Sequence, residues 1–535
     1  MGDLKRPRIA GRGLTGVPLP PADQPLHAPG VREDPRGFRS AGAGGKRLEP
    51  PAAFEPGDGV LEIELSEYAG YAGIVLANGG LEPKADSLLA RKCGMPVRIR
   101  LSEEESWSAL NAGRMAASAT TVDVLAVYGD QMDVVVPAQI GWSRGADAVV
   151  VRSGIRSLAG LRGGVVAAAR FTESDFFLRT LAAEAGIPVA VLPSPEAPPR
   201  SDAVNLLYLP DNEAAADRFL EDLGKGGGRL AGTVTWEPKV SEVLGKGGKG
   251  VRVLARNLNL LLVADVLLVN GGFARARPEV VAGLVEGMLE GNSLLRGPDR
   301  GNHLPAVAAA FGWEPEEAAE NLSRVHLSNL PENLAFFSGA VDAGGSFGML
   351  YQSAVLAYGP ALLPRPAPED RFPSLDALRA LEKSGAFRGQ RVDIAPVRTA
   401  ALSLEGEPLL RKDVRFLFQR GGNAVDPAYG GQNEAAVAEI LRLLRIGKGS
   451  LVRVRGFVDN AEWEEAKRAA STSARTFQEF AAALSLARAE TVRALLAGKG
   501  IERDRILAVG TSWVQNVGSA VPQNRRVEAE WFPVE

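Results

Sequence analysis

The sequence contains very little cysteine and histidine, and this scarcity excludes several kinds of metal and redox chemistry. Cys93 is the only cysteine, so neither an intramolecular disulfide nor a zinc cluster of the finger type can form. The three histidines, His27, His303 and His326, lie far apart along the chain, and no HExxH or similar metal signature is present. We therefore expect no catalytic zinc and no cofactor.

Long apolar runs and a strong net charge are also missing. The longest apolar stretch, 260–269, is interrupted by Asp265 and has about half of the roughly 20 residues that cross a bilayer. The chain begins with MGDLKRPRIAGRG, which lacks the apolar core of an export signal. Its net charge of −3 gives no general attraction for nucleic acid or anionic membranes. We expect no transmembrane segment and no nucleic-acid partner.

The length and composition instead predict several folded domains. The chain has 535 residues, of which 45% are hydrophobic and 23% charged, as in ordinary globular proteins. Residues 1–57 are dense in Pro, Gly, Arg and Ala, which predicts a mostly irregular arm or strap. A Pro-rich stretch at 358–373 follows a helical pattern and predicts a domain boundary, with a linker over 359–399.

Between these segments, short apolar runs alternate with helical patterns, which is typical of an open α/β sheet. The runs are Ile74–Leu76, Val97–Ile99, Val122–Val127, Ala148–Val151, Val165–Ala168 and Val251–Leu254. Residues 277–295 predict a helix, with Pro278 in its first turn and apolar residues recurring at intervals of three and four. The region 400–535 predicts strand, helix, strand, helix, strand and strand, hence a small mixed sheet with helices on one face.

Two motifs look catalytic but lie in the wrong local order. The residues Gly141-Trp142-Ser143-Arg144-Gly145 match GxSxG, yet a strand pattern rather than a helix follows Ser143. Gly245, Gly247 and Gly250 match GxGxxG, but a helix precedes them and a strand follows, the reverse of a dinucleotide site. We interpret both as turns. A serine hydrolase using Ser143 with His303 or His326 stays an alternative.

Six phrases of the central region resemble the type II periplasmic solute-binding proteins, particularly the branch serving nitrate, sulfonate and thiamine-precursor transporters. They are ANGGL, TTVDVLAV, GADAVVVRSGIRSLAGLRGGVVAA, ESDFFLRTLAAEAGI, TWEPKVSEVL and ADVLLVNGGFARARPEVVAGLVEGML. The resemblance implies a solute-binding module over 58–358 with two α/β lobes that close on a small molecule. Lobe one would comprise 58–148 and 266–358, and lobe two 149–262.

This resemblance also implies a set of residues in the cleft between the lobes: Asn78, Gly79, Thr121, Asp123, Thr172, Ser174, Trp236 and Glu237. Helix N-termini favour anions, but Glu173 and Asp175 flank Ser174 and already complement the helix dipole. A bare phosphate or sulfate is therefore disfavoured unless an arginine lies nearby, and the solute stays unidentified. No cleft residue combines a nucleophile with a positioned base, which favours binding over turnover.

The C-terminal 125 residues resemble the OmpA-like peptidoglycan-binding domain. The matching phrases are DVRFLF at 413–418, GFVD at 456–459, LSLARA at 484–489 and NRRVE at 524–528. The resemblance implies recognition of the diaminopimelate side chain of the cell-wall peptide, a zwitterion that one acid and one arginine would hold. By motif position these are Asp459 and Arg488, with Asn524 and Arg525 in support.

Two features depart from that family. Phe457 and Val458 replace the histidine and threonine of the binding loop, which removes two polar groups. Asp459 and Arg488 are also farther apart along the chain than in the family, because the segment 461–483 is longer than usual. That insert has a helical pattern and would either line the pocket or obstruct it.

The sequence thus predicts an α/β protein, with a two-lobed solute-binding fold followed by a small OmpA-like βαβαββ sandwich. The expected function is non-enzymatic: it binds a small solute in the periplasm or cell envelope and anchors to peptidoglycan. An ABC permease would be a further partner. The structural alternative is an envelope scaffold whose solute-binding module has lost its ligand.

Overall fold

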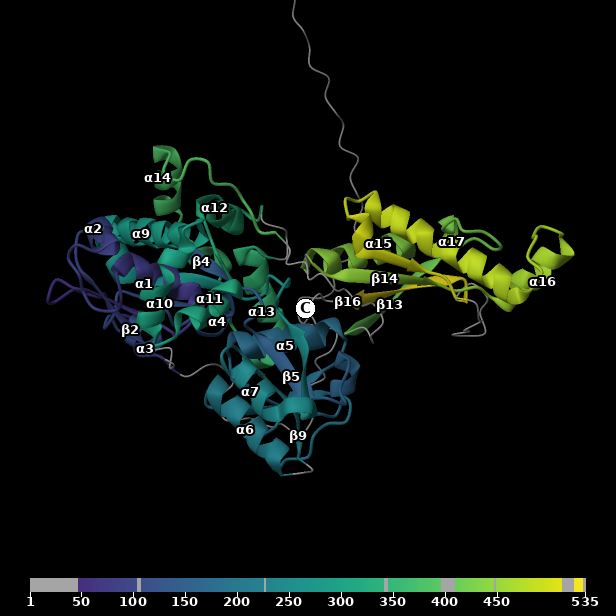
Figure 1. Cartoon of the computed structure of the whole chain (residues 1–535), viewed down its shortest axis with the longest axis horizontal. Helices are drawn as coiled ribbons and strands as arrows, with labels where there is room; N and C mark the ends of the chain where they lie inside the picture. The colour runs from purple at the N-terminus through teal and green to yellow at the C-terminus, as the bar shows by residue number, and fades with distance from the viewer. Residues whose placement is uncertain are drawn as a thin grey trace, which may run out of the picture.

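The computed structural model describes residues 47–102, 107–225, 228–340, 345–395, 409–446, 449–511 and 524–532. These residues form two α/β lobes and a C-terminal α/β domain (Figure 1). None of the helices in these ranges is both long and apolar enough to cross a membrane.

The first lobe is built on a sheet of order β12-β4-β11-β3-β1-β2. Its strands are β1 (Leu61–Leu65), β2 (Val97–Leu101), β3 (Ala117–Thr121), β4 (Val134–Ser143), β11 (Ala264–Asn270) and β12 (Val325–Leu327). β1 runs parallel to β2 and β3, whereas β11 runs antiparallel to β3 and β4. β11 returns from the other lobe and pairs with β3 and β4 in the middle of this sheet.

Helices cover both faces of the first lobe. They are α1 (Ala72–Asn78), α2 (Leu88–Cys93), α3 (Trp107–Asn111), α4 (Val122–Tyr128), α8 (Gly271–Ala276), α9 (Pro278–Arg296), α10 (Leu304–Phe311), α11 (Pro315–Ser323), α12 (Leu330–Ser338), α13 (Phe347–Leu362) and α14 (Asp376–Ser384). The helix predicted over 277–295 is confirmed as α9, with Pro278 as its first residue. Its periodic apolar residues, among them Leu284 and Met288, are buried.

Two of the apolar runs are helices rather than strands. Residues 74–76 lie in α1 and residues 122–127 form most of α4, whereas the other four runs are strands. Nearly all residues of α1 and α4 are buried, so neither helix shows the one-sided apolar stripe of a surface helix. A short, fully apolar run does not distinguish a buried helix from a buried strand.

The second lobe contains a sheet of order β10-β5-β9-β6-β8-β7 with three helices. Its elements are β5 (Ala148–Arg152), β6 (Val165–Ala169), α5 (Glu173–Glu184), β7 (Val189–Val191), β8 (Val204–Leu209), α6 (Asn212–Gly224), β9 (Leu230–Thr235), α7 (Lys239–Gly247) and β10 (Val251–Arg256). The chain enters this lobe between β4 and β5 and leaves it between β10 and β11. These two crossings are those expected of the two-lobed solute-binding fold.

Segments on either side of the lobes pack against lobe one. The Phe54 amide donates to the Asn270 side chain at 3.2 Å, and the Phe54 ring is buried. Phe372, in the segment predicted as a linker, is also buried, and its carbonyl accepts from the Val136 amide at 2.8 Å. The described parts of both segments therefore act as straps.

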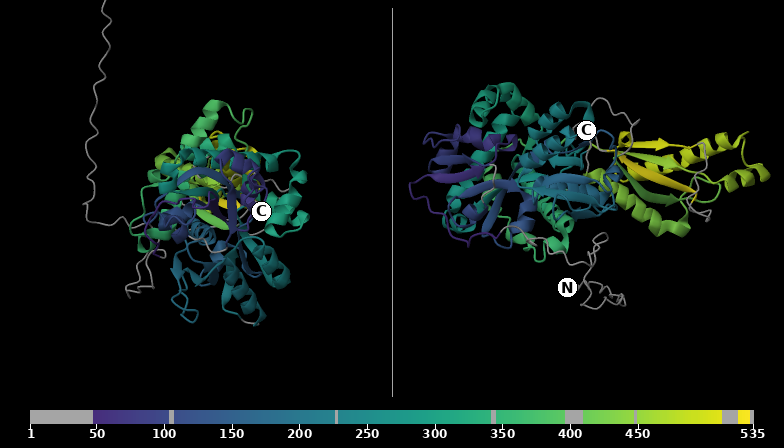
Figure 2. Two further views of the ribbon diagram at one scale, coloured as in Figure 1. Left: turned by 90° about the vertical axis from the view of Figure 1, so that its left-hand side faces the viewer. Right: turned by 90° about the horizontal axis from the view of Figure 1, so that it is seen from below.

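The C-terminal domain has a sheet of order β13-β16-β14-β15, and it lies beyond one end of the two lobes (Figure 2). Its elements are β13 (Leu410–Leu417), α15 (Gly430–Ile446), β14 (Leu451–Gly456), α16 (Asn460–Arg468), α17 (Phe477–Ala497), β15 (Ile506–Val509) and β16 (Arg526–Phe532). The predicted order of strands and helices is confirmed, with α16 added inside the long insert. The domain contacts lobe two, where Arg442 of α15 donates to Glu184 of α5 at 2.6 Å.

Candidate functional site

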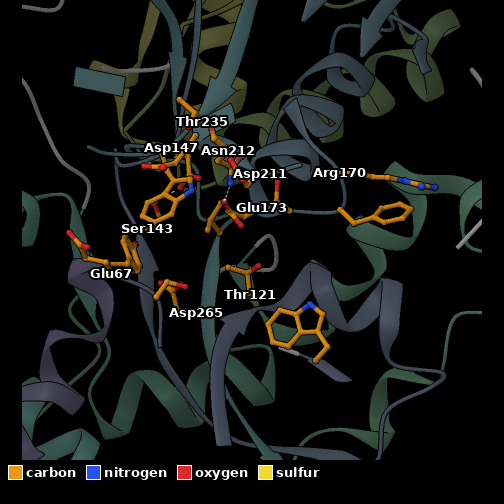
Figure 3. A pocket seen from close by; sticks show the side chains of 18 of the residues that line it. Glu67, Thr121, Ser143, Asp147, Arg170, Glu173, Asp211, Asn212, Thr235 and Asp265 are labelled. Atoms are coloured by element: carbon orange, nitrogen blue, oxygen red, sulfur yellow. Dashed lines mark hydrogen bonds between the residues drawn. The ribbon is translucent and has the colours of Figure 1, made fainter. Parts of the chain in front are cut away.

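A cavity of about 610 Å³ lies between the two lobes (Figure 3). This volume is in the range of pockets that hold small molecules. Four of the residues predicted for the cleft line this cavity: Thr121, Thr172, Trp236 and Glu237.

The local structure explains how these residues reach the cavity. Thr121 is the last residue of β3 and precedes α4. Thr172 is the N-cap of α5 and accepts a hydrogen bond from the Asp175 amide at 3.5 Å. Trp236 and Glu237 follow β9 directly. Each therefore lies where a strand ends and the chain turns, which is where open α/β sheets form ligand sites.

The other four predicted cleft residues do not line the cavity. Asn78 and Gly79 lie at the C-terminal end of α1, not after a strand; the Asn78 amide donates to the carbonyls of Gly80 and Val97. Gly79 has a positive φ of 70° and caps the helix, which glycine does without strain. Asp123 and Ser174 are buried inside α4 and α5.

Further acids line the cavity, among them Asp147, Glu173 and Asp265; of these three the sequence analysis named only Glu173 in connection with the cleft, beside Ser174. Asp147 lies in the turn between β4 and β5, Glu173 is the first residue of α5, and Asp265 lies in β11. They come from both lobes and both crossings. Asp265 left a signal in the sequence, because it interrupts the longest apolar run and a buried charge there is costly.

Each of these acids has neutral partners. The Asp147 carboxylate accepts from the Ser143 hydroxyl at 2.5 Å and from the Asn257 amide at 2.9 Å. Glu173 accepts from Asn212 at 3.3 Å, and Asp265 accepts from the Tyr71 hydroxyl at 3.3 Å.

Burial without a counter-charge raises the pKa of these acids. Burial, and then the charge of Glu173, raises the pKa of Asp147 to about 8. The same two causes raise the pKa of Asp123, which is buried and does not line the cavity, to about 7. Burial raises the pKa of Glu173, and burial followed by the charges of Asp147 and Glu173 raises that of Asp265 well above its ordinary value.

Aromatic side chains form another wall of the cavity. The Tyr68 ring contacts the Tyr71 ring edge-on, with centroids 5.2 Å apart, and the Trp236 ring at 5.9 Å. All three residues line the cavity. The site thus combines acids with aromatic faces.

Ser143 does not have the surroundings of a catalytic serine. Its hydroxyl contacts Asp147 and Asn257, while His326 contacts Glu332 with its Nε2 at 3.0 Å. Ser143 ends β4, and a tight turn leads into β5 rather than into a helix. The structure therefore does not support the hydrolase alternative.

A second polar centre lies in the C-terminal domain around Arg488. Its guanidinium is fully buried, and both terminal nitrogens donate to the Glu462 carboxylate, at 2.6 and 3.0 Å. The remaining N–H groups donate to the carbonyls of Gly422, Phe457 and Gln419 at 2.9 to 3.3 Å. An arginine has five N–H groups, so every donor of Arg488 is already used.

Of the other residues predicted for this site, Asp459 contacts Glu462 and Asn524 contacts Asp459. The Asp459 amide donates to Glu462 at 3.1 Å, which together with the reciprocal bond forms a capping box at the start of α16. The Asp459 carboxylate accepts from Asn524 at 2.9 Å. Arg525 is buried, and its carbonyl accepts from the Phe418 amide at 3.3 Å. Asp459, Arg488 and Asn524 thus converge, with Glu462 between Asp459 and Arg488.

The long insert places Glu462 there. It forms α16 at the far end of the domain, followed by the first turns of α17 (Figure 1). Val458 packs in one apolar cluster with Trp463 of α16 and Phe480 of α17, and the two rings are 5.4 Å apart. The apolar replacement at Val458 therefore provides the surface on which the insert docks. In this conformation Glu462 of the insert pairs with the Arg488 guanidinium.

Comparisons with known proteins identify the family of the C-terminal domain. The sequence model of the OmpA family matches residues 417–530, so the C-terminal domain is an OmpA-family domain. No curated protein sequence matches the chain.

Solved structures similar to the two lobes include the periplasmic aliphatic sulphonate binding protein SsuA from Escherichia coli, with 21% identity and a TM-score of 0.45 over 58% of this chain and 96% of that one. The alkanesulfonate-binding protein SsuA from Xanthomonas axonopodis pv. citri, bound to MOPS, has 19% identity and a TM-score of 0.41 over 58% and 98%. The desulfurization enzyme DSZB has 15% identity and a TM-score of 0.40 over 61% and 99%. The two-lobed fold itself rests on the sheet topology described above.

Proposed function

We propose that this chain, which ends in an OmpA-family domain, is a non-enzymatic cell-envelope protein that captures a small solute in its interlobe cleft and associates with peptidoglycan. The observation that carries the capture function is the cleft itself. It is large enough for a metabolite, it is lined from both lobes, and polar side chains converge on it beside aromatic rings. The wall contact is supported by the family of the C-terminal domain.

Capture can be tested on the purified full-length chain. Native mass spectrometry would identify a co-purified small molecule, and a library of anions, amines and sulfonates would be screened for a rise in melting temperature. A ligand at one hundred times its Kd stabilises the folded state by about 2.7 kcal/mol. Trp236→Ala should remove the response, while Trp463→Ala, in the other domain, should keep it. If neither a bound molecule nor any shift is found, the capture function is wrong.

For the wall contact we propose that Asp459 and Arg488 hold diaminopimelate after α16 moves aside. In the present conformation Glu462 occupies the position in which a ligand carboxylate would meet the guanidinium, with the same two-pronged geometry. Ligand binding therefore has to displace Glu462. This displacement would take α16 and the packing of Trp463 with it.

A peptidoglycan pull-down distinguishes an open site from a closed one. Glu462→Gln should increase retention on diaminopimelate-type peptidoglycan several-fold, because a neutral amide competes less well for Arg488 than a ligand carboxylate does. Glu464→Gln, on the same helix, is the control and should leave retention unchanged, because among the described residues Glu464 pairs with Lys467 rather than with Arg488. Soluble meso-diaminopimelate should compete with binding of the unmodified chain. If it does not compete and Arg488→Ala keeps full retention, the wall contact lies elsewhere.

A further inference from the structure

The inner wall of the interlobe cleft carries acids that have no basic partner in the part of the chain that the structure describes. Asp147, Glu173 and Asp265 line the cavity, and Figure 3 shows them around one space. Their recorded hydrogen bonds come from hydroxyl and amide groups. The charge on this wall is therefore uncompensated when the acids are ionised.

Two arginines in or against the turn that precedes Asp147 have other partners. Arg144 donates to the carbonyls of Leu258 and Ala395, at 3.2 and 2.8 Å. Arg256 donates to the Gly145 carbonyl at 2.6 Å and pairs with Glu237 at 3.2 Å.

The three basic residues that line the cavity are also engaged. Arg114 pairs with Glu49 at 2.6 Å. Lys239 pairs with Glu242 at 3.0 Å. Arg170 places its guanidinium over the Phe171 ring at 4.4 Å, and Figure 3 shows this side chain extending away from the acids. Arg114 and Lys239 are thus paired with other acids, and Arg170 extends away from this wall.

Unpartnered oxygens provide a second, independent observation. Asp147 and Asp265 are each 2% exposed, and Oδ1 of Asp147 and Oδ2 of Asp265 have no hydrogen-bond partner among the described residues. Buried polar atoms are almost always hydrogen-bonded, so two such atoms lining one cavity indicate a missing donor. A ligand with N–H groups would supply it.

A metal ion does not fit this arrangement. Within the described ranges, no three His, Cys, Asp or Glu side chains are close enough together to hold one. The acids are instead spread around a space large enough for an organic molecule, beside the rings of Tyr68, Tyr71 and Trp236. Aromatic faces attract cations, and together with spaced carboxylates they are typical of sites for organic ammonium groups.

We propose that the cleft binds an organic cation, a small metabolite with one or more ammonium groups that contact Asp147, Glu173 and Asp265. This inference rests on the proposed capture function and names the class of its solute. Asp265 lies on the sheet of lobe one and Glu173 on lobe two, so their like charges repel each other across the cleft when both are ionised. A cation between them turns this repulsion into attraction and draws the lobes together. A sulfonate would add a further negative charge.

Binding of such a cation is coupled to pH. The groups that face Asp147 from the elements packed around it are Ser143, Asn257, Asp123, Glu173, Asp265 and Tyr68. None of these groups carries a positive charge. Because protonated carboxyls do not attract an ammonium group, the cation binds best at a pH above the raised pKa values and releases protons when it binds below them.

The test uses the full chain and four probes: putrescine, spermidine, agmatine and choline. At pH 8.5 at least one should raise the melting temperature in a saturable way, while ethanesulfonate should not. Affinity for the responding probe should fall at least tenfold at pH 5.5. Calorimetry in two buffers of different ionisation enthalpy at pH 7 should show proton release.

Two substitutions test whether the cation binds at the acids of the cleft. Asp265→Asn keeps the size of the side chain and an acceptor for Tyr71. It should lower the affinity for the responding probe at least tenfold. Glu316→Gln makes the same chemical change on the exposed surface of α11 and should leave affinity unchanged. Circular dichroism would show that both variants are folded.

The outcomes separate this inference from the capture function. If ethanesulfonate or another anion binds and Asp265→Asn does not weaken it, solutes are captured but the class is not cationic. If no organic cation binds at pH 8.5, the inference is overturned. If neither class binds, the capture function fails as well.

Discussion

The molecule has two buried polar centres that differ in how far their hydrogen bonds are satisfied. In the C-terminal domain, Arg488 and Glu462 are fully buried and paired, and every guanidinium N–H has an acceptor. In the cleft, Asp147 and Asp265 are nearly as buried, yet each has an oxygen without a partner among the described residues. An incomplete centre lacks a donor that a ligand can supply, whereas at the complete centre a ligand first has to displace Glu462.

The comparison also shows that the position of a residue in a motif does not tell whether its hydrogen bonds are satisfied within the protein or left open for a ligand. Arg488 lies in an intact LSLARA phrase and by that criterion is a ligand residue. Glu462, in the insert that departs from the family, changes the environment of Arg488 without changing the motif. The site is therefore defined by the acceptors around the arginine as well as by the arginine itself.

The largest effect is expected from Arg488→Ala. This change leaves the Glu462 carboxylate buried and unpaired, which typically costs about 3–5 kcal/mol. The free energy of unfolding of the C-terminal domain should fall by that amount in a denaturant titration of the full chain. Arg493→Ala, on the same helix and paired with Glu490 near the surface, should cost less than about 1 kcal/mol.

A double variant sharpens this prediction. Replacing Glu462 and Arg488 together by Leu and Met should be far less costly than removing Arg488 alone, because no unpaired charge stays buried. If Arg488→Ala costs no more than Arg493→Ala, the C-terminal centre is not the closed, self-sufficient pair described above.

The next effect concerns the acids of the cleft. The folded state raises the pKa of Asp147 to about 8 and of Asp123 to about 7, so it holds protons that the unfolded chain has already lost. The free energy of unfolding of the ligand-free protein should therefore fall as pH rises from about 4, the ordinary pKa of an aspartate, to about 8. For each acid the total loss is about 1.4 kcal/mol per unit by which folding raises its pKa. Thermal unfolding between pH 5 and pH 8.5 measures this.

Asp265→Asn should reduce that loss. It removes one buried charge, so at pH 8 the variant should be more stable than the parent by about 1–3 kcal/mol, while at pH 5 the two should be similar. A parent protein whose stability rises with pH over this interval would show that the acids are compensated, and the contrast between the two centres would disappear.

The smallest effect is expected at the contact between the domains. Arg442 and Glu184 form a two-pronged pair, but the Arg442 side chain is 42% exposed, so the surrounding water screens it. Arg442→Ala should lower the free energy of unfolding by less than about 1 kcal/mol, with a smaller difference at high salt. A cost of several kcal/mol would mean that the two bodies depend on each other for folding.

Much of the fold could be predicted from the sequence, because local patterns determine it. The helix at 277–295 has clear periodicity, and the C-terminal strands and helices are separated by recognisable turns. Residues 74–76 and 122–127 were predicted wrongly, because these helices are buried all round and lack a polar face.

The candidate site was less predictable, because it depends on which side chains meet across the chain. Thr121, Thr172, Trp236 and Glu237 could be placed on the cleft from the resemblance of the lobes. Asp147 and Asp265 could not, since one lies in a turn and the other inside a strand, and only the pairing of β4 with β11 brings them to one cavity. The pairing of Glu462 with Arg488 could not be predicted either, because no spacing rule relates the two residues.

The contact between Arg442 and Glu184 also bears on how the protein would work when it is tethered. Lobe two contacts the C-terminal domain through this pair, and the Leu158 amide also donates to the Leu409 carbonyl at 3.0 Å. If the cell wall immobilises the C-terminal domain, lobe two is held in place with it, and lobe one is the lobe that moves when the cleft opens or closes. The mouth of the cleft would then keep a fixed orientation relative to the wall, and solutes would enter from one constant direction.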